Sequence, residues 1–332
     1  MSDHRAQITA NQATITNALK TASETPGEDI LDNLTSRPRS IPSKFFYDSR
    51  GSRLFEKITE LPEYYIPEKE KNLLKKIAPE LRAELEAADV IELGSGGPQK
   101  VITFLRSAFP AAGAPEINRY IPIDISKSAL EKSAEKLEDE FSNVEFHGLV
   151  ADFVTQLDRL PAGRKRFFCF FGSTLGNFSR SKQKNYLKNL AGEMNRGDSL
   201  LLGVDRVKKR EKLERAYNDC RGITARFNRN ILLVANKYAG TDFYLEDFSH
   251  SAPYKEDKHR IEMHLRAKNG VRVSTPKISQ EIEINGGETI HTENSHKFTG
   301  EHIEEFAGIG NLDLENVYSD KKQWFSLLHF KK

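Results

Sequence analysis

This sequence contains few cysteines, no long apolar runs and almost no excess of one charge sign. Its two cysteines, Cys169 and Cys220, cannot form a disulfide framework or a zinc site with four thiolates. No apolar stretch reaches the ~18 residues that span a bilayer, so we expect no membrane-spanning segment. The 50 lysines and arginines against 48 aspartates and glutamates leave a net charge of only +2, which disfavours nucleic acid and anionic membranes as partners.

Signals of secretion and of metal binding are also missing. The first residues show no basic segment followed by an apolar one, so we expect a cytoplasmic protein. The 9 histidines include no HxxxH or HxH pair, and we expect no metal site and no obligate protein partner. What remains is the composition of a folded protein of 332 residues, 38% hydrophobic and 30% charged, which suggests two domain-sized units or one large domain with an insertion.

From about residue 89 to residue 205, short apolar runs alternate with amphipathic segments. This alternation predicts a parallel sheet covered by helices on both faces, which is an α/β fold. The expected strands are Val90–Leu93, Tyr120–Asp124, Val144–Leu149, Phe167–Phe171 and Ser199–Val204. The expected helices lie near Lys100–Phe109, Lys127–Phe141, Val154–Leu160 and Ser181–Met194.

Beyond Asp205 the alternation stops and a separate lobe is expected. Helical residues from Lys208 to about Arg226 give way to the run Asn228–Val234 and then to a polar, strand-prone stretch. Two runs there alternate apolar and polar residues, as in an antiparallel sheet with one solvated face: Arg260–Arg266 and Lys277–Ile284. The run Trp324–Phe330 predicts a closing strand.

Several expected strands end in residues suited to binding a nucleoside. Gly94 opens a Gly-Ser-Gly loop after the first strand, where the lack of a Cβ lets the backbone approach a ligand. Asp124 ends the second strand and can accept from both ribose hydroxyls, although a helix cap is the alternative. Asp152 and Phe153 follow the third and can contact an adenine, although an ordinary loop aspartate is the alternative.

The same loop argues against two other nucleotide sites. It lacks the GK[ST] sequence of a P-loop, and Gln99 stands where a dinucleotide fingerprint has its third glycine. Acidic residues on three successive strands (Glu92, Asp124 and Asp152) instead form the pattern of an S-adenosylmethionine (SAM) methyltransferase.

Longer motifs resemble the histidine-specific methyltransferases, which make trimethylhistidine in ergothioneine biosynthesis. They are FFYDSRGSRLFEKITELPEYY (45–65), ELGSG (92–96), FFGSTLGNF (170–178), LLGVDRVK (201–208), RAYND…TARFNRN (215–230) and TENSHKF (292–298). The resemblance implies a Rossmann-like class I SAM-dependent methyltransferase domain with a second, substrate-binding α+β lobe. It also implies SAM as cofactor and L-histidine, methylated on its α-amino group, as the small-molecule substrate.

Individual site residues follow from these motifs. For the cofactor the resemblance implies Gly94, Lys100, Asp124, Asp152 and Phe153. For the substrate it implies Asn177 and Tyr217 at the carboxylate, Tyr47 and Gly172 near the α-amino group, and Tyr64, Glu293 and Ser295 at the imidazole. We take Tyr47, Gly172 and Asn177 as the catalytic set.

The pair at the imidazole also makes chemical sense by itself. In an extended segment, Glu293 and Ser295 point to the same side, and together they can accept from and donate to an imidazole. A solvated strand face is the alternative. Asn294 and His296 flank this pair and Gly97-Pro98 follows the cofactor loop, and both departures from the family pattern bear on ligand contacts.

The division of the chain that we expect follows from these assignments. Residues 1–65 and 208–297 form the substrate lobe, and residues 66–207 and 298–332 form the methyltransferase domain. Two rival functions remain: an N-methyltransferase for another amino acid or aromatic amine, and a degenerate SAM-binding sensor or scaffold.

Overall fold

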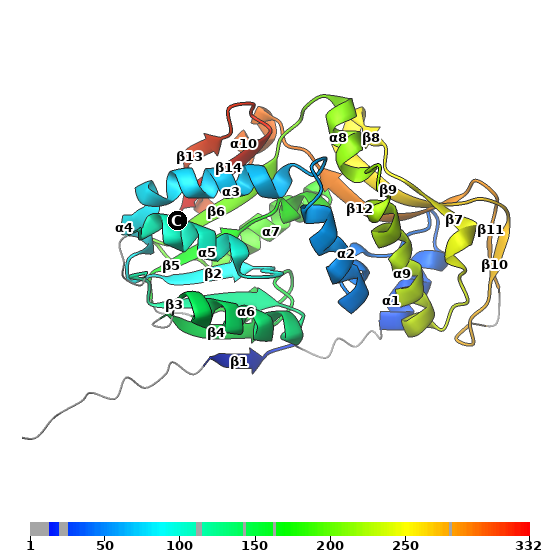
Figure 1. The fold of residues 1–332 in the computed structure, drawn as a ribbon, viewed down its shortest axis with the longest axis horizontal. Helices are drawn as coiled ribbons and strands as arrows, with labels where there is room; N and C mark the ends of the chain where they lie inside the picture. The colour runs from blue at the N-terminus through cyan, green and yellow to red at the C-terminus, as the bar shows by residue number, and fades with distance from the viewer. Residues whose placement is uncertain (1–12, 20–25, 111–114, 142–143, 162–163, 279–280) are drawn as a thin grey trace, which may run out of the picture.

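An eight-stranded sheet dominates the fold, with strand order β1-β4-β3-β2-β5-β6-β14-β13 (Figure 1). The computed structural model describes residues 13–19, 26–110, 115–141, 144–161, 164–278 and 281–332. The expectation that the first residues form no secretion signal concerns residues 1–12 and lies outside the described part. The strands are β1 (Thr14–Asn17), β2 (Asp89–Leu93), β3 (Arg119–Asp124), β4 (Glu145–Val150), β5 (Arg166–Phe170), β6 (Ser199–Asp205), β13 (Asp313–Ser319) and β14 (Phe325–Lys331). Pairing is parallel from β1 to β6, whereas β14 runs antiparallel to both β6 and β13. The predicted α/β class is confirmed.

Two hydrophobic clusters lie on opposite faces of this sheet. Successive residues of a strand alternate between them: Val90 and Phe167 belong to one cluster, and Ile91 and Phe168 to the other. Helices α3 (Ile66–Ile77), α5 (Gln99–Ala108) and α6 (Lys127–Glu140) contribute to the first cluster, and α7 (Arg180–Glu193) and α10 (Gly300–Glu304) to the second. Burial on both faces explains why these strands read as continuous apolar runs.

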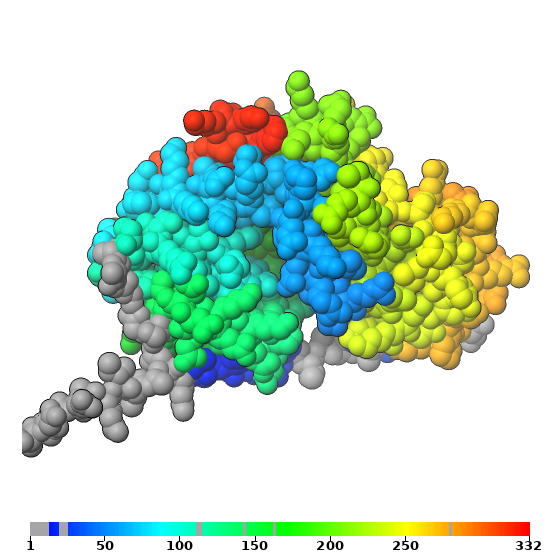
Figure 2. All heavy atoms as spheres, in the orientation of Figure 1, coloured from blue at the N-terminus to red at the C-terminus, as the bar shows by residue number. Residues whose placement is uncertain are grey.

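A smaller antiparallel sheet forms the second part of the molecule, with order β12-β9-β7 and β8 paired to β9. Its strands are β7 (Phe248–Ser251), β8 (Tyr254–Lys255), β9 (Arg260–Ala267) and β12 (Thr289–His296), with a two-stranded sheet of β10 (Val271–Val273) and β11 (Ile282–Ile284) beside it. Helix α9 (Ile223–Ala239) packs on β7, on β9 and on α1 (Pro26–Thr35) and α2 (Ser49–Thr59). In Figure 2, α2 (blue) lies between this part (yellow) and the large-sheet part (cyan and green).

The remaining elements are short helices. They are η1 (Ser43–Phe46), η2 (Ala78–Leu81), α4 (Arg82–Leu85), η3 (Leu157–Arg159), η4 (Thr174–Asn177), α8 (Arg210–Tyr217), η5 (Leu245–Asp247), η6 (Glu256–Lys258) and η7 (Ile309–Asn311). The N-terminal segment serves both parts, because β1 pairs with β4 of the large sheet whereas α1 and α2 pack on α9.

The structure corrects three local expectations. No α-helix forms over Val154–Leu160, because the Asp152 carboxylate accepts from the Val154 N–H and the Thr155 hydroxyl and so stabilises a turn there. The run Asn228–Val234 continues α9, whose buried Phe227 and Ile231 recur at helical spacing. Within Lys277–Ile284, only Ile282–Ile284 forms a strand among the residues described.

Candidate functional site

The five residues expected at the cofactor lie along one edge of the large sheet, where its parallel strands end. Gly94 follows β2, Asp124 ends β3, and Asp152 and Phe153 follow β4. Lys100 lies in the first turn of α5, directly after the glycine loop. This is the edge at which doubly wound sheets bind nucleosides.

Asp124 joins two of these loops. One carboxylate oxygen accepts from the Gly96 N–H at 3.1 Å, and the other accepts from the Ser126 N–H at 2.9 Å. Burial raises the pKa of Asp124, and these backbone donors oppose that rise. A carboxylate has about four lone-pair directions, so both oxygens can still accept from ribose hydroxyls.

The glycine loop itself is shaped for a ligand. Gly94 has φ +65° and a Cβ there would lie 2.8 Å from the Phe153 ring, whereas a Cβ on Gly96 or Gly97 would meet nothing within 4 Å. Ser95 Oγ is buried and has no hydrogen-bond partner among the residues described. An open backbone face and an unpartnered hydroxyl fit a polar ligand such as SAM.

Glu70, which sequence reasoning missed, joins this edge to the next loop. Its fully buried carboxylate pairs with Lys100 Nζ at 2.9 Å and accepts from the Gly172 N–H at 2.6 Å. Gly172 follows β5 with φ +78°, and a Cβ there would lie 2.8 Å from Lys100 Nζ. Lys100 is therefore bound to a protein carboxylate that also fixes the backbone near the expected α-amino group.

All seven residues expected at the substrate line one pocket. Tyr47 and Tyr64 come from the α2 region, Gly172 and Asn177 from the segment after β5, Tyr217 from α8, and Glu293 and Ser295 from β12. The walls are completed by Phe55, Ile58, Ile66, Ser173, Thr174, Ala216, Thr224, Phe227 and Met263. Tyr47 is at the rim, with 41% of its surface exposed, whereas Tyr217 is buried.

Inside the pocket, side chains expected at opposite ends of the substrate are hydrogen-bonded to each other. Asn177 Nδ2 donates to Glu293 Oε1 at 3.2 Å, and the hydroxyls of Tyr217 and Ser295 are 2.7 Å apart. The rings of Tyr64 and Tyr217 meet edge to face, with centroids 5.9 Å apart. The pocket therefore presents amide, carboxylate and hydroxyl groups between aromatic walls, which suits a small zwitterion with a polar ring.

Glu293 is the carboxylic acid that lines this pocket, and its pKa is shifted. Burial raises its pKa to about 7, although the ammonium group of Lys297 lowers it. Near neutral pH this side chain therefore exchanges between an acceptor-only carboxylate and an acid that can donate. An imidazole titrates in the same range.

The alternation of β12 separates the flanking residues from the pocket. Glu293 and Ser295 share one face of the strand, and neither Asn294 nor His296 lines the pocket. Asn294 instead contacts the His291 ring at 3.0 Å. Lys297, directly after this strand, contacts the hydroxyls of Tyr217 and Ser295 from behind the pocket. The sequence analysis overlooked this residue, although its spacing from Glu293 and Ser295 was visible.

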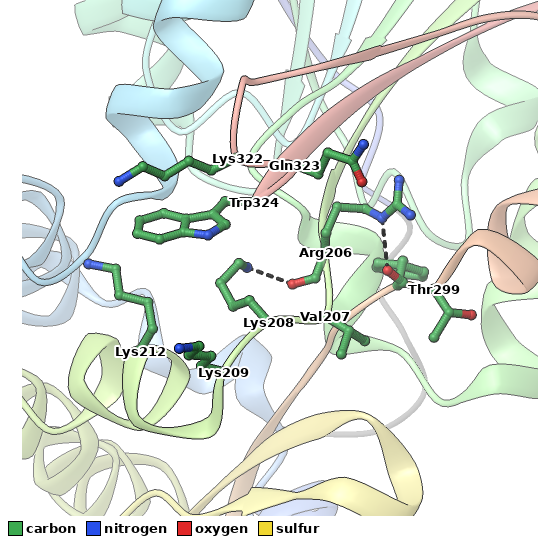
Figure 3. A pocket seen from close by; sticks show the side chains of 10 residues that line it. Arg206, Val207, Lys208, Lys209, Lys212, Thr299, Lys322, Gln323 and Trp324 are labelled. Carbon is green, nitrogen blue, oxygen red and sulfur yellow. Dashed lines mark hydrogen bonds between the residues drawn. The ribbon is translucent and has the colours of Figure 1, made fainter.

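A second hollow, which shares no lining residue with this pocket, is lined by Lys208 and its neighbours (Figure 3). Five of its residues are basic: Arg206, Lys208, Lys209, Lys212 and Lys322. Lys212 and Lys322 hold their ammonium groups 5.0 and 4.8 Å from the centre of the Trp324 ring. In the described part of the chain, no three histidine, cysteine or acidic side chains are grouped as metal ligands would be, and no described helix is long and apolar enough to cross a membrane.

Comparison with known proteins agrees with the motifs. Residues 26–332 match the family described as "Histidine-specific methyltransferase, SAM-dependent". A histidine N-alpha-methyltransferase of Mycobacterium tuberculosis (strain CDC 1551 / Oshkosh) is 39% identical over 299 residues, which are 90% of this chain and 92% of that protein. Its namesake in Mycolicibacterium smegmatis is 37% identical over 286 residues, covering 86% and 88% of the two chains. Ergothioneine biosynthesis protein 1 of Schizosaccharomyces pombe is 32% identical over 245 residues, which are 70% of this chain and 31% of that protein. The chain therefore belongs to the SAM-dependent histidine-specific methyltransferases.

Proposed function

We propose that this protein transfers methyl groups from SAM to the α-amino nitrogen of L-histidine, up to trimethylhistidine, in ergothioneine biosynthesis. The observation that carries this proposal is the pocket in which all seven expected substrate residues meet. Glu70 supports it further, because this side chain links the pocket's Gly172 to Lys100 at the cofactor edge.

Each group of side chains has a proposed task. Asp124 holds the ribose, Asp152 and Phe153 hold the adenine, and Gly94 and Lys100 lie at the methionine end of SAM. In the pocket, Asn177 and Tyr217 bind the histidine carboxylate, and Tyr64, Glu293 and Ser295 bind its imidazole. Tyr47 and Gly172 then lie beside the α-amino group. The domain boundaries given above are part of the same proposal, except that β1 (Thr14–Asn17) pairs with the large sheet.

The reaction requires no strong general base from the protein. An α-amino group has a pKa of ~8, so a neutral amine at pH 7 costs only about 1–2 kcal/mol. When bound, SAM supplies a methyl group on a positively charged sulfur, and the amine lone pair forms the C–N bond as the C–S bond breaks. The chain's own contribution is to orient the amine in line with that bond and to exclude water. Proximity and orientation of this kind are sufficient for a large increase in rate.

A turnover assay tests the reaction, and a substrate comparison tests the pocket. Mass spectrometry of histidine incubated with SAM and the protein should show added methyl groups. With Glu293→Ala, the KM for histidine should rise by ten-fold or more, since truncating a buried charged partner costs ~2–5 kcal/mol. The KM for phenylalanine, which has no ring nitrogens, should rise much less in the same variant.

Three outcomes separate the alternatives. Wild-type efficiency of the variant on histidine would place the imidazole pocket elsewhere. Methylation of a different amine in place of histidine would refute the substrate and leave the reaction type standing. SAM binding without turnover of any amine would favour the sensor or scaffold.

A further inference from the structure

A buried cluster of charged side chains lies directly behind two hydroxyl groups of the substrate pocket. It consists of Asp205, Lys297, Lys208 and Tyr65, and we call it the Asp205 cluster. The side chains of Asp205 and Lys297 are fully buried and their charged atoms are 2.8 Å apart. The Asp205 carboxylate also accepts from the Tyr65 hydroxyl, at 2.8 and 2.9 Å, and from Lys208 Nζ. None of the four residues has a role in the function proposed above.

Lys297 connects this cluster to the pocket. Its Nζ donates to Tyr217 Oη at 3.0 Å and to Ser295 Oγ at 2.8 Å, in addition to Asp205. An ammonium group has three protons and no lone pair, so all its donors are used. Lys297 can therefore act on the two hydroxyls only as a donor.

This donation limits where the two hydroxyl protons can point. Because Tyr217 Oη and Ser295 Oγ are 2.7 Å apart, one of them donates to the other. Lys297 occupies a lone pair on each oxygen, and the contact between the hydroxyls uses one of their two protons. Because the Tyr64 hydroxyl is also hydrogen-bonded to Tyr217, the second proton is left either for Tyr64 or for an acceptor of a ligand on the pocket side. Without Lys297, the same hydroxyls are free to turn lone pairs toward the pocket instead.

We propose that Lys297 is a positioning residue for substrate binding, which holds the hydroxyls of Tyr217 and Ser295 as a hydrogen-bond donor toward the histidine carboxylate or imidazole nitrogen. The proposal rests on the proposed function, which takes these hydroxyls as substrate contacts. Asp205 holds Lys297 in place in turn.

The cluster also provides a variant that should fold. In Lys297→Met, Asp205 keeps its contacts with Lys208 and with the Tyr65 hydroxyl, so no buried carboxylate is left without partners. Lys208→Met is a matched control. It removes the other ammonium group from Asp205, yet Lys208 Nζ bonds to Tyr65 and Asp205 and to the Arg206 carbonyl, the last of which is drawn in Figure 3, and not to the pocket hydroxyls.

The test is a double-mutant cycle read as kcat, KM and kcat/KM for histidine from full saturation curves, with SAM affinity measured by calorimetry. Lys297→Met should lower kcat/KM at least tenfold, mainly through KM, and leave the SAM Kd within twofold; Lys208→Met should leave the KM within twofold. In a Tyr217→Phe/Ser295→Ala background, Lys297→Met should change kcat/KM by less than twofold, because the groups through which it acts are gone.

The outcomes separate this proposal from the function on which it rests. An equal loss in both backgrounds would overturn it, because a long-range effect of the charge on Glu293 would persist without the hydroxyls. Unchanged kinetics of Lys297→Met in the wild-type background would also overturn it. If the unmodified protein does not methylate histidine at all, the proposed function itself fails, which the first measurement of the cycle reveals.

Discussion

Removing the charge of Glu293 should make the protein more stable at high pH. Burial raises the pKa of this carboxyl from the usual 4.5 to about 7. Because each unit of pKa corresponds to ~1.36 kcal/mol, that rise amounts to about 3 kcal/mol. The folded state binds the proton more tightly than the unfolded state. The stability contributed by the protonated acid is therefore fully present below pH 4.5 and is lost as the pH rises through about 7.

Glu293→Gln isolates this effect, because glutamine keeps the shape and a carbonyl acceptor for Asn177 but cannot ionise. We expect the two proteins to differ little in their pH dependence below pH 4.5. Above pH 7 the variant should gain up to about 3 kcal/mol relative to wild type. Denaturant unfolding without ligands, followed between pH 4 and pH 9, measures the difference directly.

Binding of histidine should offset part of the stability that wild type loses when the buried Glu293 carboxyl ionises. An imidazole N–H or imidazolium beside the carboxylate favours its charged form, so binding should release a proton from Glu293 near pH 6–7. Calorimetry in buffers of different ionisation enthalpy detects that proton, and Glu293→Gln should lack it. Parallel stability curves for wild type and variant from pH 4 to pH 9 would refute the reasoning, because they would mean that Glu293 titrates normally.

Two further predictions concern the cofactor edge. Asp124→Ala should weaken SAM binding at least tenfold by calorimetry, since hydrogen bonds to a charged group are worth ~1.5–3 kcal/mol each, and an unchanged Kd would leave Asp124 with only its structural contacts to the Gly96 and Ser126 N–H groups. Gly94→Ala should lower the Tm and weaken SAM binding, because it combines φ +65° with a Cβ 2.8 Å from the Phe153 ring. Gly222→Ala is its control, with the same φ of +65° and nothing within 4 Å of the new Cβ, so equal Tm losses in the two variants would show that the Phe153 contact is unimportant.

The sequence was most informative where a residue's neighbours are close in the chain or set by strand order. The apolar runs from Val90 to Val204 predicted the parallel strands, because burial on both faces removes polar positions from them. Acidic residues at the strand ends then had to lie near one another, since parallel strands end at one edge. The same logic failed over Val154–Leu160, where the Asp152 side chain holds a turn that no periodicity reveals.

The site residues that were missed have partners far away in the chain. Glu70 contacts Gly172 within the large-sheet part. Lys297 follows β12 of the smaller part and contacts Asp205 of the large sheet. A charged residue in a helix or strand reads as solvent-exposed unless its partner is known, and composition supplies no partner. The motifs predicted residues that line one pocket because motifs match whole segments. The side chains behind that pocket could be recognised only from the three-dimensional arrangement.

The substrate pocket is built across the junction between the large sheet and the smaller lobe. Gly172 and Asn177 come from the large sheet, whereas Tyr217 and Glu293 come from the lobe. If histidine binds there as proposed, it acts as a non-covalent cross-link between the two parts of the fold. A ligand of this kind stabilises the assembled state by about 2.7 kcal/mol at 100 times its Kd. Because this free energy stabilises both parts together, the substrate should make them unfold more nearly as one cooperative unit. Resistance to proteolysis at the junction then reports the fractional occupancy of the site.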